Sequence, residues 1–413
     1  MNPTPILIVS DAPSAASGFA RITRDLASRL HGSRLKCRVA TAGFWDIPDP
    51  TIPFFQFGLG GFANDNLPLG AIATAARRWF QGEKGIILTI YDAARLTAFS
   101  LPQTMPILGS EDVDVQKFLL SPFGERWGYF PIDARGVGEK LTPVLGATIS
   151  GFDRILAYGA YGQRILKNTL PDREVDFLPH GIDRSTFRPL GRKGREMLWR
   201  KFPTELKDPE GNPILGEHRV NEDDLLLGVV ATNQARKDWG TVLEVLRLLP
   251  SGWKLWGHID RLVNTWNIPE LAREFGVQER VFFTNSLDDA QLAALYSTCD
   301  VTLAPGLGEG FGFPIVESMS CGTPVAIFDY AGGADLVPPV SKIRAGMFRL
   351  EGAYSFYRPV MDAGMIADKI QTLQVTGSVD WRAESEAYDW PGLWPRWEKW
   401  FEAGLTAFRG KNS

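Results

Sequence analysis

A glycine-rich segment between two apolar runs constrains the fold of this chain more than any other feature. Glycine occupies every second position from Gly306 to Gly312, directly after the apolar residues 300–304. Pro314 suits the first turn of a helix, and residues 325–327 form the next apolar run. This order predicts a strand, a tight turn, a helix and a second strand, which is the repeating unit of a parallel sheet.

The predicted turn has the chemistry of an anion site. A helix start leaves backbone N–H groups free, so a diphosphate can lie against residues 311–313 without a dedicated cation. Glu309 precedes this turn, and Glu317 follows it eight positions later. One carboxylate could hold sugar hydroxyls and the other a ribose diol. The alternative is that both are ordinary solvated carboxylates beside a structural turn.

Residues 309–325, EGFGFPIVESMSCGTPV, resemble the signature of the retaining glycosyltransferases of family 4. The resemblance extends to LPHGID and FRP within residues 178–189, and to SGFAR and LA within residues 17–27. It implies the GT-B fold, an α/β architecture of two facing Rossmann-like domains with doubly wound parallel sheets. In that fold the C-terminal helix crosses back to the first domain.

Hydrophobic periodicity independently predicts two such domains. Short apolar runs alternate with longer amphipathic stretches, as parallel strands with crossover helices require. Expected strands are residues 6–9, 38–41, 86–90 and 154–157, then 225–231, 254–256, 281–283, 301–304 and 325–327; expected helices include 20–30 and 161–170. We expect a first domain at residues 1–187, a linker at 188–224, a second domain at 225–388 and a C-terminal helix at 389–413. In this helix the spacing of Trp394, Trp397, Phe401 and Leu405 places them on one face, which predicts packing in a core.

Two cations follow the first strand of the second domain. Arg236 and Lys237 lie in a loop that should share its sheet edge with the glycine turn, where ligands of such sheets bind. They could stabilise the charge of a leaving diphosphate. The resembled family places an arginine here and a lysine five positions later. Lys237 matches the lysine, but Thr232 stands in the place of the arginine, so Arg236 would supply the second charge. The alternative is a pair of surface cations at a helix start.

Three further residues are candidates on weaker signals. Gly18 could bring backbone N–H groups to the donor, although Ser17 could equally be a plain N-cap. His258 could border the nucleotide. Asp133 stands where many relatives carry a histidine and could contact the acceptor or the donor sugar, or be an ordinary turn residue. The predicted catalytic set is Arg236, Lys237, Glu309 and Asp133, and the predicted donor-binding set is Gly18, Glu309, Gly310, Phe311, Gly312, Phe313, Glu317 and His258.

Composition excludes several classes. The net charge of −4 argues against a surface generally coated with nucleic acid, and no apolar run approaches the roughly 20 residues of a membrane span. Peripheral membrane contact stays open. Three isolated cysteines and four dispersed histidines suggest neither a disulfide framework nor a metal site, so we expect a cytoplasmic protein without metal or cofactor. A basic cluster follows Arg188, with a solvated linker as the first explanation and an acceptor patch as the second.

The expected activity is metal-independent transfer of a sugar, with retention, from a nucleoside-diphosphate sugar to an acceptor hydroxyl. The acceptor could be a glycan, a lipid, a small molecule or modified DNA. Alternatives are a phage-type DNA-base glycosyltransferase, a GT-B epimerase or phosphorylase, and a non-catalytic sugar-nucleotide binder. A Rossmann dehydrogenase is disfavoured because no G-x-G-x-x-G follows the first strand.

Overall fold

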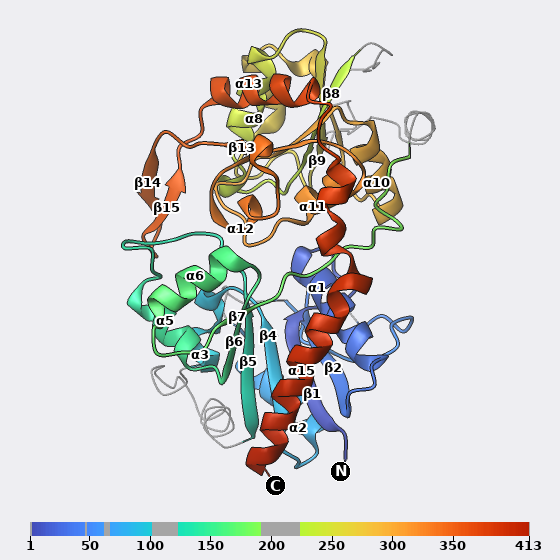
Figure 1. The fold of residues 1–413 in the computed structure, drawn as a ribbon, viewed down its shortest axis with the longest axis vertical. Helices are drawn as coiled ribbons and strands as arrows, with labels where there is room; N and C mark the ends of the chain where they lie inside the picture. Colours follow the sequence, from blue (N-terminus) through green and yellow to red (C-terminus); the bar gives the residue numbers. More distant parts are fainter. Residues whose placement is uncertain (1, 46–47, 62–66, 101–122, 191–223, 413) are drawn as a thin grey trace. The chain divides into compact units, whose positions relative to one another are not determined.

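A computed structural model describes residues 2–412 except 46–47, 62–66, 101–122 and 191–223. The chain divides into two compact units. The first contains Met1–His180 together with Pro391–Ser413, and the second contains Gly181–Trp390 (Figure 1). The predicted domain boundaries stay predictions, since most of the expected linker and of its basic cluster lies outside the described residues.

The first unit is built on a seven-stranded sheet of order β3-β2-β1-β4-β5-β6-β7. Every neighbouring pair in it is parallel. Its strands are β1 (Thr4–Asp11), β2 (Cys37–Phe44), β3 (Phe55–Gly58), β4 (Gly85–Ile90), β5 (Gly124–Phe130), β6 (Arg154–Ala157) and β7 (Asp176–Phe177). Its helices include α1 (Gly18–His31), α2 (Leu69–Phe80), α3 (Thr97–Ser100), α5 (Pro143–Ser150) and α6 (Ala160–Thr169).

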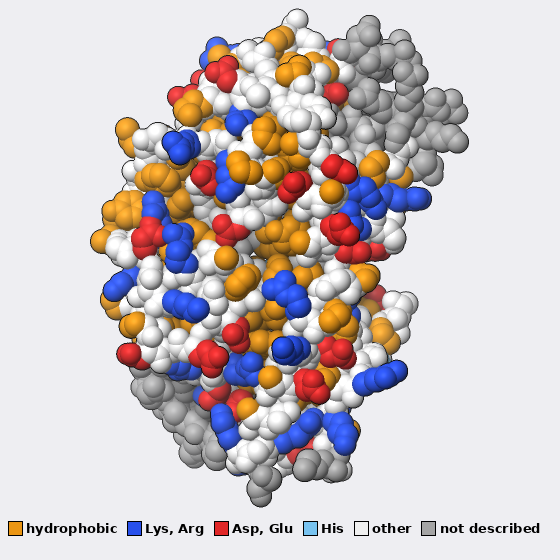
Figure 2. All heavy atoms as spheres, viewed as in Figure 1, with side chains coloured by type: hydrophobic (Ala, Val, Ile, Leu, Met, Phe, Trp, Pro, Cys, Tyr) orange, Lys and Arg blue, Asp and Glu red, His pale blue; other side chains and the backbone are white. Residues whose placement is uncertain are grey.

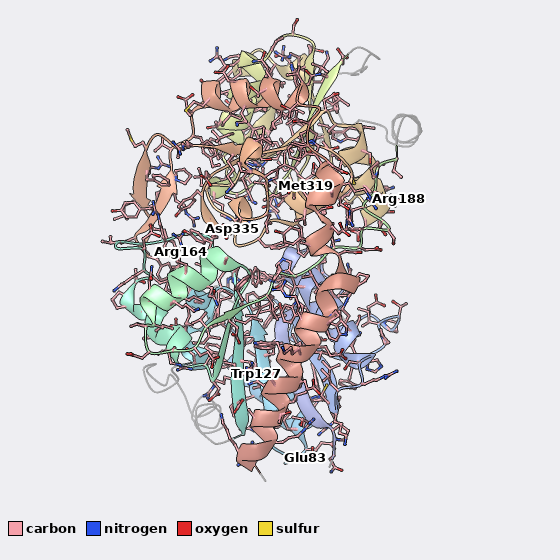
Figure 3. The ribbon with its side chains drawn as sticks, viewed as in Figure 1. Glu83, Trp127, Arg164, Arg188, Met319 and Asp335 are labelled. Atoms are coloured by element: carbon pink, nitrogen blue, oxygen red, sulfur yellow. The ribbon has the colours of Figure 1, made fainter. Side chains whose placement is uncertain are left out.

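The C-terminal helix α15 (Trp390–Asn412) completes this first unit. Trp397, fully buried, donates a hydrogen bond from Nε1 to the carbonyl of Pro179 at 2.9 Å. Trp400 packs edge-on against Trp127 of β5, with ring centroids 5.3 Å apart; Figure 3 labels Trp127 beside α15. The aromatic stripe of this helix is therefore core packing, as its spacing predicted.

The second unit contains a six-stranded parallel sheet of order β10-β9-β8-β11-β12-β13. Its strands are β8 (Leu225–Val230), β9 (Trp253–His258), β10 (Val281–Thr284), β11 (Val301–Ala304), β12 (Val325–Phe328) and β13 (Lys342–Ile343). Its helices include α8 (Trp239–Leu248), α9 (Ile268–Glu274), α10 (Asp289–Thr298), α11 (Phe313–Ser320), α12 (Ala331–Ala334), α13 (Ala363–Gln374) and α14 (Trp381–Glu384). A separate antiparallel hairpin pairs β14 (Phe348–Glu351) with β15 (Phe356–Pro359).

The strand order of the second sheet locates its ligand edge. From β8 the chain winds outward to β9 and β10, and then returns to place β11 on the opposite side of β8. The loops after β8 and β11 therefore diverge at a topological switch point, where open parallel sheets bind ligands. The doubly wound α/β prediction is confirmed for both sheets. None of the described helices is long and apolar enough to cross a membrane.

Candidate functional site

The loop after β8 presents the two predicted cations. Arg236 and Lys237 lie in a short 3-10 turn (Ala235–Lys237) that leads into α8. Asp238 takes a left-handed conformation with φ of 41° and caps α8 by accepting a hydrogen bond from the Thr241 amide. The chain thus turns sharply between the cations and the helix, and it leaves both side chains at the carboxyl edge of the sheet.

A buried asparagine fixes this loop. Asn233 is fully buried, and its side chain donates to three backbone carbonyls in the loop after β9. Its Oδ1 accepts a hydrogen bond from the Trp266 amide at 3.0 Å. Because a buried amide with satisfied hydrogen bonds tolerates few other arrangements, Asn233 is a rigid anchor for the cations. The sequence prediction missed this role.

Both cations converge on Glu309. Nη1 of Arg236 lies 3.1 Å from Oε1 of Glu309, and Nζ of Lys237 donates to the same oxygen. The side chains of Lys237 and Glu309 are each 13% exposed, whereas that of Arg236 is 37% exposed. Burial alone would raise the pKa of Glu309, but the charges and hydrogen bonds of Lys237 and Arg236 outweigh it and lower the pKa to about 2. Glu309 is therefore a carboxylate at neutral pH.

The loop after β11 is tied to the cation loop through its backbone. The Leu307 amide donates to the Arg236 carbonyl at 2.8 Å, and Nη1 of Arg236 lies 3.3 Å from the Gly308 carbonyl oxygen. Gly308 and Gly312 have φ angles of 143° and 101°, which side-chain-bearing residues rarely adopt. Gly308 and Gly312, two of the four alternating glycines, thus serve a backbone path that other residues would strain.

A second glycine turn packs against the first. The Gly333 amide donates to the Glu309 carbonyl at 3.0 Å, and a Cβ at Gly332 would lie 2.3 Å from the Gly310 carbonyl oxygen. Figure 3 labels Met319 in α11, which follows the first turn, and Asp335, which directly follows α12 and its two glycines. Close contact between the turns fixes the backbone on either side of Glu309.

Helix α11 begins at the expected place. Gly312 is its N-cap and supplies no side-chain hydrogen bond, and Pro314 occupies the first turn. Phe311 is buried, with its ring 5.8 Å from those of both Phe313 and Tyr388. The half-buried Gly310, Gly312 and Phe313 expose part of the turn, so what Phe311 can offer to an anion is its backbone amide rather than its ring.

Glu317 lies within α11 and is only 2% exposed. Its Oε2 accepts a hydrogen bond from the hydroxyl of Tyr296 in α10 at 2.8 Å. The contact fixes the carboxylate one helical turn behind the glycine turn. Tyr296 carries no sequence signal for this role, since it occupies a buried position on an ordinary helix.

His258 ends β9, on the opposite side of β8 from the glycine turn. Its Nδ1 lies 3.2 Å from Oγ1 of Thr284. Burial lowers the pKa of His258 to about 4, although a hydrogen bond with the Thr284 backbone opposes the shift. It is therefore a neutral imidazole at neutral pH. The described contacts do not join His258 to Glu309 or to the two cations.

Gly18 and Asp133 belong to the first unit. Gly18 opens α1, and Ser17 caps that helix by accepting a hydrogen bond from the Ala20 amide at 3.0 Å, which is the plain alternative for this loop. Asp133 follows the end of β5 and is half-buried. Beside Gly18, the buried Asp11 accepts hydrogen bonds from the hydroxyls of Ser17 and Tyr91, a pairing that the sequence prediction also missed.

Comparison with known proteins shows what this chain is similar to. Residues 216–339 match the family described as "Glycosyl transferases group 1". A D-inositol 3-phosphate glycosyltransferase of Nocardia farcinica is 31% identical over 48% of this chain and 41% of its own length. An MMP alpha-(1->4)-mannosyltransferase of Mycolicibacterium hassiacum is 30% identical over 70% of this chain and 61% of its own length. The chain therefore spans less than two thirds of either relative.

Solved structures share the whole architecture. Sucrose-phosphate synthase from Thermosynechococcus elongatus superposes with a TM-score of 0.71 at 17% identity, covering 98% of this chain and 100% of that one. Anabaena HepE in complex with UDP-glucose gives a TM-score of 0.66 at 15% identity, covering 97% and 99%. At these identities the likeness establishes the fold, and the chain has the GT-B fold that the sequence resemblance implied.

Proposed function

We propose that this protein transfers a sugar from a nucleoside-diphosphate sugar to an acceptor hydroxyl, with retention at the anomeric carbon and without a metal ion. The observation that carries the proposal is the convergence of Lys237 and Arg236 on Glu309 beside the start of α11. Positive charge, the backbone amides of a helix start and a carboxylate are the three groups that binding and cleavage of an activated sugar require.

The diphosphate would lie between the start of α11 and Lys237. As the bond between the anomeric carbon and the diphosphate breaks, its electron pair passes to the diphosphate oxygen. Lys237 and Arg236 would stabilise this new charge, which makes a dedicated metal ion unnecessary. The acceptor oxygen would then bond to the anomeric carbon on the same face, and a phosphate oxygen would take its proton.

A bound diphosphate and Glu309 would compete for Lys237. Nζ of Lys237 donates to Glu309 in the structure, so a phosphate oxygen beside it would draw the ammonium away from the carboxylate. Glu309, with Arg236 still beside it, could then accept hydrogen bonds from hydroxyls of the transferred sugar. Glu317 would accept from the ribose, with Tyr296 orienting it. We assign neither glutamate the acid or nucleophile role that a retaining glycosidase needs.

The names of the relatives support glycosyl transfer, and they narrow the choice of the first substrates to test. Those named above are a glycosyltransferase and a mannosyltransferase, and the HepE structures contain UDP and UDP-glucose. Uridine donors are therefore the first to offer, with nucleotide donors of mannose second. A cytoplasmic location accords with the free Cys37, Cys299 and Cys321.

The deciding experiment measures nucleoside diphosphate released from a panel of sugar nucleotides, with and without EDTA. We expect slow hydrolysis of one donor, faster release when the right acceptor is present, and no loss of rate on chelation. NMR of the first product should show the donor's anomeric configuration.

Each rival function gives a different result in this assay. Conversion of the donor to its epimer without release would identify an epimerase, and binding without turnover would identify a sensor. A requirement for divalent cations would overturn the metal-independent mechanism. Salt-sensitive binding of duplex DNA would instead favour DNA-base glycosylation.

A further inference from the structure

The β14–β15 hairpin extends from the second unit as a two-stranded ribbon (Figure 1). Hydrophobic and basic side chains gather over it at the left of Figure 2, and Met347 and Leu350 are 66% and 49% exposed. Arg349 of β14 and Arg358 of β15 are direct partners across the hairpin. The two arginines thus occupy equivalent positions, but they make different contacts.

Arg358 reaches the loop that carries Glu309. Its Nη1 lies 3.3 Å from the carbonyl oxygen of Leu307, two positions before Glu309. Arg349 instead pairs with Glu351 on its own strand, and its side chain is 65% exposed. Of this cross-strand pair, Arg358 is therefore the arginine that contacts the loop carrying Glu309.

The hairpin also holds the second glycine turn. The Tyr330 hydroxyl donates to the Tyr357 carbonyl, and the rings of Tyr330 and Phe348 lie 5.3 Å apart. Tyr330 is the N-cap of α12, whose Gly333 amide donates to the Glu309 carbonyl. The ribbon therefore contacts both turns that set the position of Glu309.

Leu307 is held on both of its backbone polar groups. Its N–H donates to the Arg236 carbonyl at 2.8 Å, and its C=O accepts from Arg358. The next residue, Gly308, has a φ of 143°, a conformation that glycine adopts at little cost and leaves as easily. A loop this rich in glycine gains its fixed shape from such external contacts rather than from its own side chains.

We propose that Arg358 is a positioning residue for sugar transfer: by holding the Leu307 carbonyl, it fixes the loop that presents Glu309 to Lys237 and to the donor sugar. The inference rests on the proposed glycosyl transfer. Arg358 acts through Leu307 and touches neither Glu309 nor Lys237 in the contacts described. Its loss should therefore affect the rate of the chemical step more than the binding of the nucleotide, because small misplacements of reacting groups cost rate.

The test compares Arg358→Ala, Arg358→Lys and the matched control Arg349→Ala. In the Arg358→Ala protein, kcat for donor hydrolysis should fall about tenfold, within the range that loss of orientation produces. The Kd for the nucleoside diphosphate alone should stay within about twofold, since nothing in its proposed seat is removed. Arg358→Lys should recover part of kcat, because an ammonium can still donate one hydrogen bond. Arg349→Ala should match the wild-type protein.

Three outcomes would overturn the proposal: unchanged kcat in Arg358→Ala, equal losses in Arg358→Ala and Arg349→Ala, or a parallel loss of nucleotide affinity. A second readout does not depend on turnover. Amide hydrogen exchange across residues 307–312 should be faster in Arg358→Ala than in Arg349→Ala. If the wild-type protein released no nucleoside diphosphate, the proposed function would fail. Equal rates of amide exchange in Arg358→Ala and Arg349→Ala would instead show that Arg358 does not position the loop.

Discussion

Nη1 of Arg236 lies 3.1 Å from Oε1 of Glu309, although the two residues are 73 positions apart in the chain. The strand order explains the meeting. Because β8 and β11 are neighbours in a parallel sheet, the loops that follow them start from the same edge. Lys237 joins the pair from the same turn as Arg236, so two cations face one carboxylate and net positive charge remains at the place where an activated sugar would bind.

The two cations should differ in their weight for catalysis. Lys237→Ala should lower kcat by roughly 10²- to 10³-fold, the loss typical of removing one group that stabilises developing charge. Arg236→Ala should cost less, since its side chain is 37% exposed against 13% for Lys237. Steady-state kinetics measure kcat, and titration calorimetry measures the affinity for the donor separately.

Arg247, which pairs with Glu244 on the exposed face of α8, gives the control. Arg247→Ala should leave kcat and donor affinity near their wild-type values. A large loss of donor affinity in Lys237→Ala with unchanged kcat would reverse the assignment of this cation to the leaving group.

Glu309 should make stability depend on pH in a defined window. Its pKa is about 2 in the folded chain against an ordinary 4.5, so the unfolded chain binds the proton more readily. The stabilisation is present above pH 4.5 and is lost as the pH falls toward 2. At neutral pH it is on the order of 3 kcal/mol.

Urea unfolding of the wild-type protein and Glu309→Gln over this pH range tests the linkage. The difference in unfolding free energy between the two proteins should be largest near neutral pH and shrink on acidification. A difference independent of pH would mean that the two cations do not lower the pKa of Glu309.

The sequence predicted the parts of the site whose signals are local. Residues 301–304 and 154–157 were expected as strands and form β11 and β6, because continuous apolar runs suit strands covered on both faces. The glycine turn and the helix start at Phe313 follow from Gly312 and Pro314. These features depend on residues that are close together in the chain, so they can be predicted from one sequence.

Long-range partners could not be predicted in the same way. Tyr296 meets Glu317 from a helix with no distinguishing motif, and Asn233 bonds to carbonyls about 30 positions away. Strand β13 is two residues long, too short for any periodicity. The two strands of the hairpin that carries Arg358 have the sequences FRLE and FYRP, in which charged residues interrupt the apolar ones. They therefore lack the apolar runs by which the sheet strands were predicted.

The contact between Tyr296 and Glu317 should matter for nucleotide binding. Glu317→Ala should weaken affinity for the nucleoside diphosphate more than it slows transfer, because the proposed ribose contact is lost in every bound state. Tyr296→Phe keeps the ring and removes one hydrogen bond to the Glu317 side chain, worth about 0.5–1.5 kcal/mol. It should give a smaller loss in the same direction.

Titration calorimetry with the nucleoside diphosphate reads both variants. Tyr354 is half-buried on the turn of the hairpin, so Tyr354→Phe removes a hydroxyl elsewhere and serves as the control. Transfer slowed at unchanged nucleotide affinity would move Glu317 from the ribose to the reacting sugar.

The C-terminal helix should be essential to the stability of the first unit. Trp397 is fully buried, stacks on Phe401 at 5.9 Å and donates to the Pro179 carbonyl. Trp397→Ala should cost about 3–5 kcal/mol through the cavity it leaves, whereas Trp397→Phe should cost less because the aromatic packing is partly kept. Thermal unfolding should show the lowest midpoint for Trp397→Ala and no shift for the exposed Lys399→Ala. Equal unfolding midpoints in all three variants would mean that residues 391–413 do not share the core of the seven-stranded sheet. A helix that only lay on the surface of that sheet would leave its unfolding unchanged.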